Sequence, residues 1–162
     1  MTKILNLFYI IILLSAFCFV ACTNDDVFFQ YKKIKSTGWN KDSVLSFDFS
    51  INNSSIPYNI YVNIRNTSEY SYQNFWLFIK KSVANSDSTF EVIQSDTVEC
   101  YLADERGKWL GSGAGAMYEM PLLIEKNAHL EQKKYRYELT QGMRNDILQG
   151  ISDIGLRVEK IE

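Results

Sequence analysis

The 162-residue sequence predicts an all-β protein, an antiparallel β-sandwich of about eight strands. Three observations lead to this fold class. Aromatic residues make up 14% of the chain and proline occurs only twice, a composition that favours strands. Short segments with apolar residues at every second position recur along the chain, with polar turns between them. No segment of normal helix length has a helical pattern, so each strand is expected to bury one face against a second sheet.

The first half of the chain contains four expected strands, which are residues 27–35, 44–50, 58–66 and 75–83. The first has apolar positions that do not alternate strictly, which is typical of an edge strand. The third (YNIYVNIRN) is the clearest, because Ile60, Val62 and Ile64 share one face. The fourth begins apolar on both faces, as a central strand does. The turn at residues 36–42 carries a tryptophan, and the loop at residues 67–74 carries two tyrosines.

The second half repeats this pattern, with expected strands at residues 89–102, 120–125, 133–140 and 154–161. The first of these segments is long enough for one long strand or two short ones, and Cys100 lies on its apolar face. Residues 141–148 are expected to form one or two helical turns, and residues 150–153 a loop. Strands at this regular spacing, without an internal repeat, predict a single domain.

The start of the chain is typical of a bacterial lipoprotein signal. Residues 7–21 are apolar except for Ser15, and Cys22 follows them directly. An apolar segment of about 15 residues fits a signal peptide and is short for a membrane-spanning helix of about 20. Ala21 is the small residue that a signal peptidase needs before the cut. We therefore expect residues 1–21 to be a cleaved signal peptide and Cys22 to carry palmitate or a related lipid, with a plain signal peptide or an uncleaved anchor as the alternatives.

Several classes of function find no support in the composition. A net charge of −2 at pH 7 provides no basic face for nucleic acid. The single histidine, His129, lies in a polar segment where no nucleophile and acid are expected beside it. Once Cys18 is assigned to the signal and Cys22 to the lipid, Cys100 remains without a disulfide partner. The sequence therefore predicts no enzyme, no metal site and no cofactor.

Aromatic and arginine side chains are the remaining candidates for binding. Tyr61, Tyr70, Tyr72, Trp76 and Trp109 are the notable aromatics, and the last four are the candidates for a partner or ligand surface. The alternative is that most of them fill the core. A groove lined by the loop tyrosines or Trp76 would favour sugar, whereas a flat patch around Trp109 and residues 111–116 would favour a protein partner. Arg144 stands out near the C-terminus, and Arg65 and Arg157 lie on polar strand faces where they can pair with acids such as Asp48 or Asp153.

Several segments occur together in a recognisable order. They are the lipoprotein start at Cys22, the pair Gly38 and Trp39, and residues 58–66, 96–97, 102–104, 107–111, 141–144 and 150–158. On these segments the chain resembles the GldH family of gliding-motility lipoproteins from Bacteroidota. The resemblance implies an outer-membrane lipoprotein of the envelope machinery that serves gliding and is tied to the export of surface adhesins. It implies no catalytic residues.

We therefore expect residues 22–27 to be the lipidated cysteine with an acidic linker, and residues 28–162 to be the sandwich domain. The expected function is a non-enzymatic component or scaffold of an envelope complex, held to the outer membrane by lipid, with other envelope proteins as partners. A lipid-anchored glycan-binding module is the alternative. Asp25 and Asp26 are either a solvated linker or a sorting signal, since acids after the cysteine resemble the signal that sends Bacteroidota lipoproteins to the outer leaflet. Whether the domain faces the periplasm or the cell surface stays open.

Overall fold

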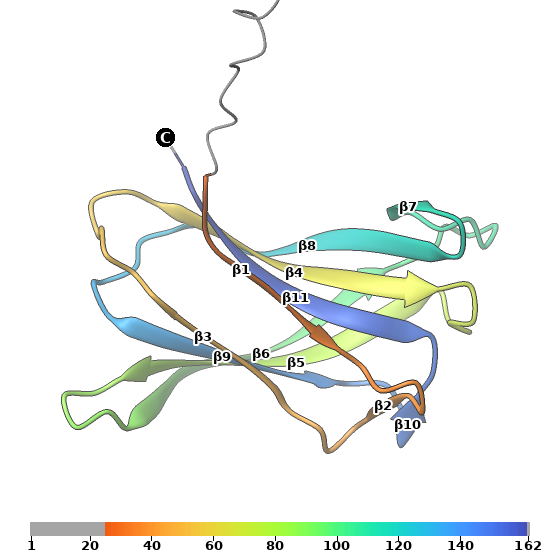
Figure 1. Ribbon diagram of the computed structural model, residues 1–162, viewed down its shortest axis with the longest axis horizontal. Helices are drawn as coiled ribbons and strands as arrows, with labels where there is room; N and C mark the ends of the chain where they lie inside the picture. Colours follow the sequence, from red (N-terminus) through yellow and green to blue (C-terminus); the bar gives the residue numbers. More distant parts are fainter. Residues whose placement is uncertain (1–24, 162) are drawn as a thin grey trace, which may run out of the picture.

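Two antiparallel β-sheets lie face to face in the computed structural model, which describes residues 25–161 (Figure 1). Within this range every helix or strand assigned is a strand, so the predicted all-β sandwich is confirmed. The strands are β1 (Asp26–Lys33), β2 (Trp39–Asn40), β3 (Leu45–Ser50), β4 (Tyr58–Thr67), β5 (Asn74–Ala84), β6 (Phe90–Tyr101), β7 (Ser112–Ala114), β8 (Met117–Ala128), β9 (Lys134–Gln141), β10 (Ile147–Leu148) and β11 (Ile151–Lys160). The expected signal peptide at residues 1–21 and Cys22 lie outside the described residues.

The two sheets have different sizes. The larger sheet has the strand order β1-β11-β4-β8-β7, and the smaller sheet has the order β3-β9-β5-β6. The short strands β2 and β10 pair with each other as a separate two-stranded ribbon. Phe28 of β1 and Phe49 of β3 bring one edge of each sheet together, with ring centroids 5.4 Å apart. In the smaller sheet β5 lies between β9 and β6, so its backbone is paired on both sides.

The core lies between the sheets, where each strand turns its alternate residues inward. Ile60, Val62 and Ile64 of β4 are completely buried, as the alternation of their segment predicts. Leu77 of β5 and Leu139 of β9 are equally buried on the inner face of the smaller sheet. Each such side chain contributes about 1.5–3 kcal/mol when it leaves water, so this packing holds the two layers together.

A buried ion pair also links the two sheets. Lys81 of β5 is a buried lysine, and its Nζ lies 2.7 Å from Oε2 of Glu125 in β8. The hydroxyl of Tyr137, from β9, donates a hydrogen bond to the same carboxylate. Burial, followed by the charge of Glu125, raises the pKa of Tyr137 well above its usual value. Removing one partner of a buried pair leaves an uncompensated charge, so the loss of either Lys81 or Glu125 alone would be strongly destabilising.

The strand register gathers the loops at two ends of the sandwich. Asp26 lies across from Glu159, and Glu159 lies across from Asn59, so β1 begins where β11 ends and β4 begins. We call this the proximal end, because the chain enters the domain there. The opposite, distal end carries the β2–β10 ribbon and the loops at residues 68–73, 102–111 and 142–146 (Figure 1).

The structure corrects the expectation of helical turns at residues 141–148. Gln141 ends β9, and Ile147 and Leu148 form β10 instead. In this ribbon Leu148 lies across from Trp39, and both side chains are buried at the distal end of the core. Residues that lie across from each other in two paired strands have their side chains on the same face. The β2–β10 ribbon can therefore bury Trp39 and Leu148 together, which favours strands over helical turns here. Residues 151–153, expected in a loop, are the first residues of β11.

The ordered sheet begins at Asp26, before the boundary at residue 28 that the sequence suggested. Between residues 25 and 161 no helix has the length and apolar character needed to cross a membrane.

Candidate functional site

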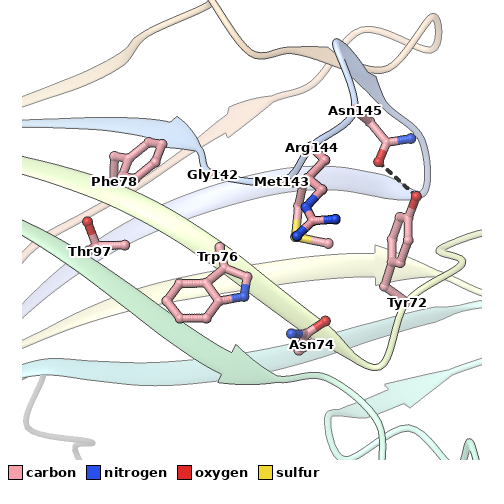
Figure 2. Close-up of a pocket in the computed structure, with 9 residues that line it drawn as sticks. All are labelled: Tyr72, Asn74, Trp76, Phe78, Thr97, Gly142, Met143, Arg144 and Asn145. Carbon is pink, nitrogen blue, oxygen red and sulfur yellow. Dashed lines mark hydrogen bonds between the residues drawn. The ribbon is translucent and has the colours of Figure 1, made fainter.

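A groove of about 560 Å³ lies on the outer face of the smaller sheet, near the distal end (Figure 2). Its floor is β5, where Asn74, Trp76 and Phe78 point outward because residues two apart in a strand share a face. The other lining residues are Tyr72, Thr97, Gly142, Met143, Arg144 and Asn145. Three segments therefore meet here: the loop before β5, the neighbouring strand β6 and the loop after β9.

The floor of the groove is unusually aromatic for an outer sheet face. Phe78 is 46% exposed and Tyr72 is 38% exposed, while Trp76 is half-buried. Large aromatic side chains left in water within a concave surface are typical of ligand sites. Trp76 and Phe78 thus give the groove a flat, apolar surface that a ring can stack on.

The wall of the groove is held in place by a buried glutamine. Gln141 donates a hydrogen bond from its side-chain amide to the carbonyl of Asn145, at 2.7 Å. Its side-chain oxygen accepts a hydrogen bond from the backbone N–H of Met143, at 2.8 Å. Because Gln141 is only 2% exposed, these bonds are shielded from water and fix the loop from inside.

Close contact between wall and floor depends on a glycine. The backbone N–H of Gly142 donates to the carbonyl of Trp76 at 2.8 Å. A Cβ at this position would lie 3.2 Å from Cβ of Trp76 and 3.3 Å from two ring atoms of Phe78, so a larger residue would push the loop outward. At the end of the groove the hydroxyl of Tyr72 donates to Oδ1 of Asn145 at 2.7 Å. The groove is therefore a preformed surface.

One positively charged side chain, that of Arg144, lines this groove. The guanidinium of Arg144 is exposed and lies between Trp76 and Tyr72 in the view of Figure 2. Among the described residues Arg144 forms no ion pair. Asn74 donates its side-chain amide to Oε1 of Glu99, at 2.6 Å, which occupies that carboxylate oxygen beside the groove. The site thus combines an aromatic floor with an uncompensated positive charge.

The structure brings together two of the four aromatic candidates. Tyr72 and Trp76 line the groove, whereas Tyr70 is buried beneath it and donates from its hydroxyl to the carbonyl of Asn74, at 2.8 Å. Trp109 is half-buried away from the groove, with its ring 5.6 Å from that of Tyr118. Tyr70 is therefore a packing residue, whereas Trp109 packs only partly against the core. Sequence reasoning did not place the wall loop, although the apolar character of both faces at residues 75–79 was a sign of outward aromatics.

A second cluster of polar and aromatic side chains lies on the outer face of the larger sheet. Glu119 accepts hydrogen bonds from Tyr31, Asn63 and Arg65 at 2.7, 2.9 and 2.8 Å. The Arg65 guanidinium also covers the Tyr31 ring, 3.8 Å from its centroid. Burial alone would raise the pKa of the Glu119 carboxyl, but the three hydrogen bonds hold it below its usual value. Burial, followed by the bond to Glu119, raises the pKa of Tyr31 to about 12.

The acidic pair after the cysteine lies at the proximal end, where Asp26 begins β1 and Asp25 precedes it. The backbone carbonyl of Asp25 accepts a hydrogen bond from Lys160 at 2.9 Å, and the two side chains lie 3.6 Å apart. Oδ1 of Asp26 lies 3.7 Å from the guanidinium of Arg157. Asp25 and Asp26 therefore contact the last strand.

Cysteine, histidine and the acidic residues do not form a reactive cluster among the described residues. Burial, followed by the charge of Glu99, raises the pKa of the Cys100 thiol to about 12, so the thiol stays protonated at neutral pH. His129 is exposed in the loop between β8 and β9. Over residues 25–161 no three His, Cys, Asp or Glu side chains come close enough to hold a metal ion.

Comparison with solved structures finds distant likenesses. A crystal structure of a protein from Sulfurospirillum deleyianum is 11% identical with a TM-score of 0.47, and the match covers 86% of this chain and 100% of that one. A mitogen from Yersinia pseudotuberculosis is 4% identical with a TM-score of 0.35, over 83% of this chain and 86% of that one.

Sequence comparison is more specific. The family model described as GldH lipoprotein matches residues 26–158. The gliding motility lipoprotein GldH of Flavobacterium johnsoniae is 31% identical over 157 residues, which cover 93% of this chain and 94% of the relative. A GldH homolog of Christiangramia forsetii is 30% identical over 158 residues, which cover 93% of both chains. The resemblance inferred from sequence is thereby confirmed: the chain belongs to the GldH family of gliding-motility lipoproteins.

Proposed function

We propose that this lipoprotein is a non-enzymatic component of an outer-membrane complex that serves gliding and the secretion linked to it. Family membership establishes a gliding-motility lipoprotein, anchored to a membrane of the cell envelope. The proposal adds the outer membrane, the lipid on Cys22 and a scaffolding role. The observation that carries it is the short distance along the chain between Cys22 and the start of the sheet at Asp26.

This distance fixes how a lipidated domain would stand on the membrane. Asp26 is four positions after Cys22, so the two residues are separated by at most about 14 Å, since an extended chain covers at most ~3.6 Å per residue. The proximal end would then lie against the bilayer, and the distal end with its groove would point away from it. Strand β4 has 10 residues, or about 33 Å at the usual rise per residue, which separates the groove from the lipid. Such an arrangement presents the distal end to a partner.

Lipid attachment is tested by labelling cells with a palmitate analogue. We expect Cys22→Ala to lose the label and to be released from the membrane or left uncleaved. Cys100→Ala is the matched control, because it removes the buried cysteine of the domain and should keep the label. A Cys22→Ala protein that is labelled normally would contradict lipidation at this residue.

The acidic pair requires a separate test, because the structure gives it contacts that are independent of sorting. If Asp25 and Asp26 form a sorting signal, the double change to Asn should alter the protein's exposure to an external protease. Lys160→Gln weakens the contact of Asp25 with β11 but keeps both acids, so it should leave that exposure unchanged. Equal exposure of all three proteins would show that the pair acts only within the fold.

The scaffolding role is tested by crosslinking in native membranes. A photo-crosslinking side chain at Leu110, which is 51% exposed at the distal end, should capture a defined envelope protein. The same side chain at Asn53, which is exposed in the loop between β3 and β4 at the proximal end, is the control and should capture much less of it. Equal capture from both ends, or none, would count against the proposed orientation.

Glycan binding is a second candidate, and the groove is the observation that favours it. Tyr72 and Trp76, two of the aromatic residues expected to line a sugar groove, do line this one, and Phe78 extends the aromatic surface. Binding of oligosaccharides should change the fluorescence of Trp76, and Trp76→Ala should remove the response that this side chain gives. A glycan array on which the purified lipoprotein retains no sugar would exclude this second function.

A further inference from the structure

We propose that the groove binds acidic sugar residues, with Arg144 pairing with the sugar carboxylate while the ring stacks on Trp76 and Phe78. This inference rests on the second candidate function, glycan binding, and names the class of glycan.

The polar groups that remain without partners in the groove are mostly donors. Within residues 25–161, neither the indole N–H of Trp76 nor the guanidinium of Arg144 has a hydrogen-bond partner. Asn145 accepts from Tyr72 through its Oδ1, which leaves its side-chain N–H groups free. A surface rich in donors suits a ligand rich in acceptors, above all an anionic one.

Acceptors are fewer but present. The side-chain oxygen of Asn74 is open, because this residue uses its amide N–H to bind Glu99. Thr97, exposed on β6, can donate or accept through its hydroxyl. Sugar hydroxyls both donate and accept, so they match this mixture, and a carboxylate on the ring uses the excess of donors.

An extended peptide fits the groove less well than a sugar. The floor strand β5 is paired with β6 on one side and with β9 on the other, so no peptide can add to it as a further strand. The backbone N–H groups of Gly142 and Met143 already donate hydrogen bonds, to the carbonyl of Trp76 and the side-chain oxygen of Gln141. The groove therefore lacks the alternating main-chain donors and acceptors that a peptide backbone would need.

The charges around the groove favour an anion. None of the nine residues that line it is acidic. Asp146, the last residue of the wall loop, is neutralised by an ion pair with Lys41 at 2.5 Å. Glu99 is the nearest acid along the floor, and Asn74 already binds it. The positive charge of Arg144 is thus the one full charge that the lining offers to a ligand.

The rigidity of the wall makes this charge useful for recognition. Gln141 and Tyr72 hold the backbone and side chain of Asn145, next to Arg144, before any ligand arrives. Less conformational entropy is then lost on binding than with a mobile loop. Arg144 can place two parallel N–H donors against a carboxylate, a geometry that lysine cannot reproduce.

The test compares two trisaccharides of the same linkage, one of galacturonic acid and one of galactose, titrated into the detergent-purified lipoprotein. We expect the acidic sugar to bind about tenfold more tightly at low salt, and added salt to reduce this preference. Arg144→Gln should abolish the preference but keep the weaker binding of the neutral sugar. Arg106→Gln, which changes an exposed arginine of the turn at residues 104–107, should keep it. Far-ultraviolet circular dichroism checks that each variant is folded.

The possible failures are distinguishable. Equal binding of both sugars, or a preference that survives in Arg144→Gln, would overturn the acidic-sugar inference and leave glycan binding intact. Binding of neither sugar, together with an empty glycan array, would overturn the inference and the glycan-binding function on which it rests.

Discussion

Two arginines close to outward aromatic rings differ in the partners that the fold provides: Arg65, on the larger sheet, has them, whereas Arg144, in the loop after β9, forms no ion pair among the described residues. On the larger sheet Arg65 lies 3.8 Å from the centroid of Tyr31 and 2.8 Å from Glu119. In the loop after β9, Arg144 lies over the groove that Trp76 lines, and it has no ion-pair partner within residues 25–161. The guanidinium of Arg65 therefore has partners within the fold, whereas that of Arg144 remains available to a ligand.

This difference in partners distinguishes an arginine that stabilises the fold from one that can bind a ligand. A guanidinium that already holds a carboxylate and a ring contributes to stability, and its donors are occupied. Paired arginines occur on both sheets. On the smaller sheet Arg136 binds Asp48 at 2.7 Å and lies 3.9 Å from the centroid of the Phe90 ring. On the larger sheet Arg157 lies 4.2 Å from the Tyr61 ring and 3.2 Å from Glu159, although its Nε is buried without a hydrogen-bond partner. An arginine on a braced loop without such partners contributes little to stability and is available to a ligand. Stability and binding measurements on matched variants can therefore test the comparison.

The largest effect is expected for Glu119→Gln. This change places an amide N–H₂ against donors from Tyr31, Asn63 and Arg65, one of which, Asn63, is buried. We expect the free energy of unfolding to fall by about 2 kcal/mol, measured by urea denaturation. Glu105→Gln, in an exposed turn, is the control and should change stability by less than about 0.5 kcal/mol. A Glu119 variant as stable as this control would remove the distinction between the paired Arg65 and the open Arg144.

Low pH should remove the difference in the free energy of unfolding between the wild type and Glu119→Gln. The folded-state pKa of Glu119 lies below its usual value, because its hydrogen bonds outweigh the effect of burial. The stability that its carboxylate contributes is therefore fully present above about pH 4.3, the ordinary value for Glu, and is lost as pH falls through the lower folded-state pKa. Wild type and Glu119→Gln should differ at pH 7 and converge in strong acid. A gap that stays constant from pH 7 to pH 3 would assign the loss to packing.

Sequence patterns were sufficient for most of the fold. Alternation at residues 58–66 and 133–140 identified strands whose inward residues, such as Ile60 and Leu139, are completely buried. The exception was the end of the domain at residues 141–148, where no period was long enough to distinguish a short strand from a helical turn. There the burial of Leu148 against a ribbon from the start of the chain decided the outcome, a long-range effect.

The partners of the arginines were harder to predict, because they depend on the register between strands that are distant in sequence. Arg65 does lie across from Asp153, one of the acids suggested for it, but its ion pair is with Glu119, 54 residues away on β8. Asp48 instead binds Arg136 of β9. The groove was partly predictable for the same reason: Tyr72 and Trp76 were singled out, but their meeting with Arg144 required the fold of the wall loop.

A smaller effect is expected for Gln141→Leu, which tests whether the open face is preformed. The leucine keeps the volume of this buried side chain but leaves Met143 N–H and the Asn145 carbonyl without their partner. We expect a loss of about 1–2 kcal/mol and faster amide hydrogen exchange at residues 142–146. Gln149→Leu, which removes one exposed hydrogen bond to Thr37, should leave that exchange unchanged. Unaltered exchange in Gln141→Leu would show that the wall is held by other contacts.

The smallest effect on stability should come from Arg144→Gln, and it is the sharpest test of the comparison. With no ion-pair partner to lose among residues 25–161, this variant should unfold within about 0.5 kcal/mol of the wild type. Arg65→Gln is its counterpart and should lose about 1–2 kcal/mol, because it gives up Glu119 and the Tyr31 ring. Similar losses in both variants, measured by urea denaturation at one pH, would mean that Arg144 also acts within the fold. If Arg144→Gln leaves the free energy of unfolding unchanged while Arg65→Gln lowers it, ligand binding is the role that the open position of Arg144 supports.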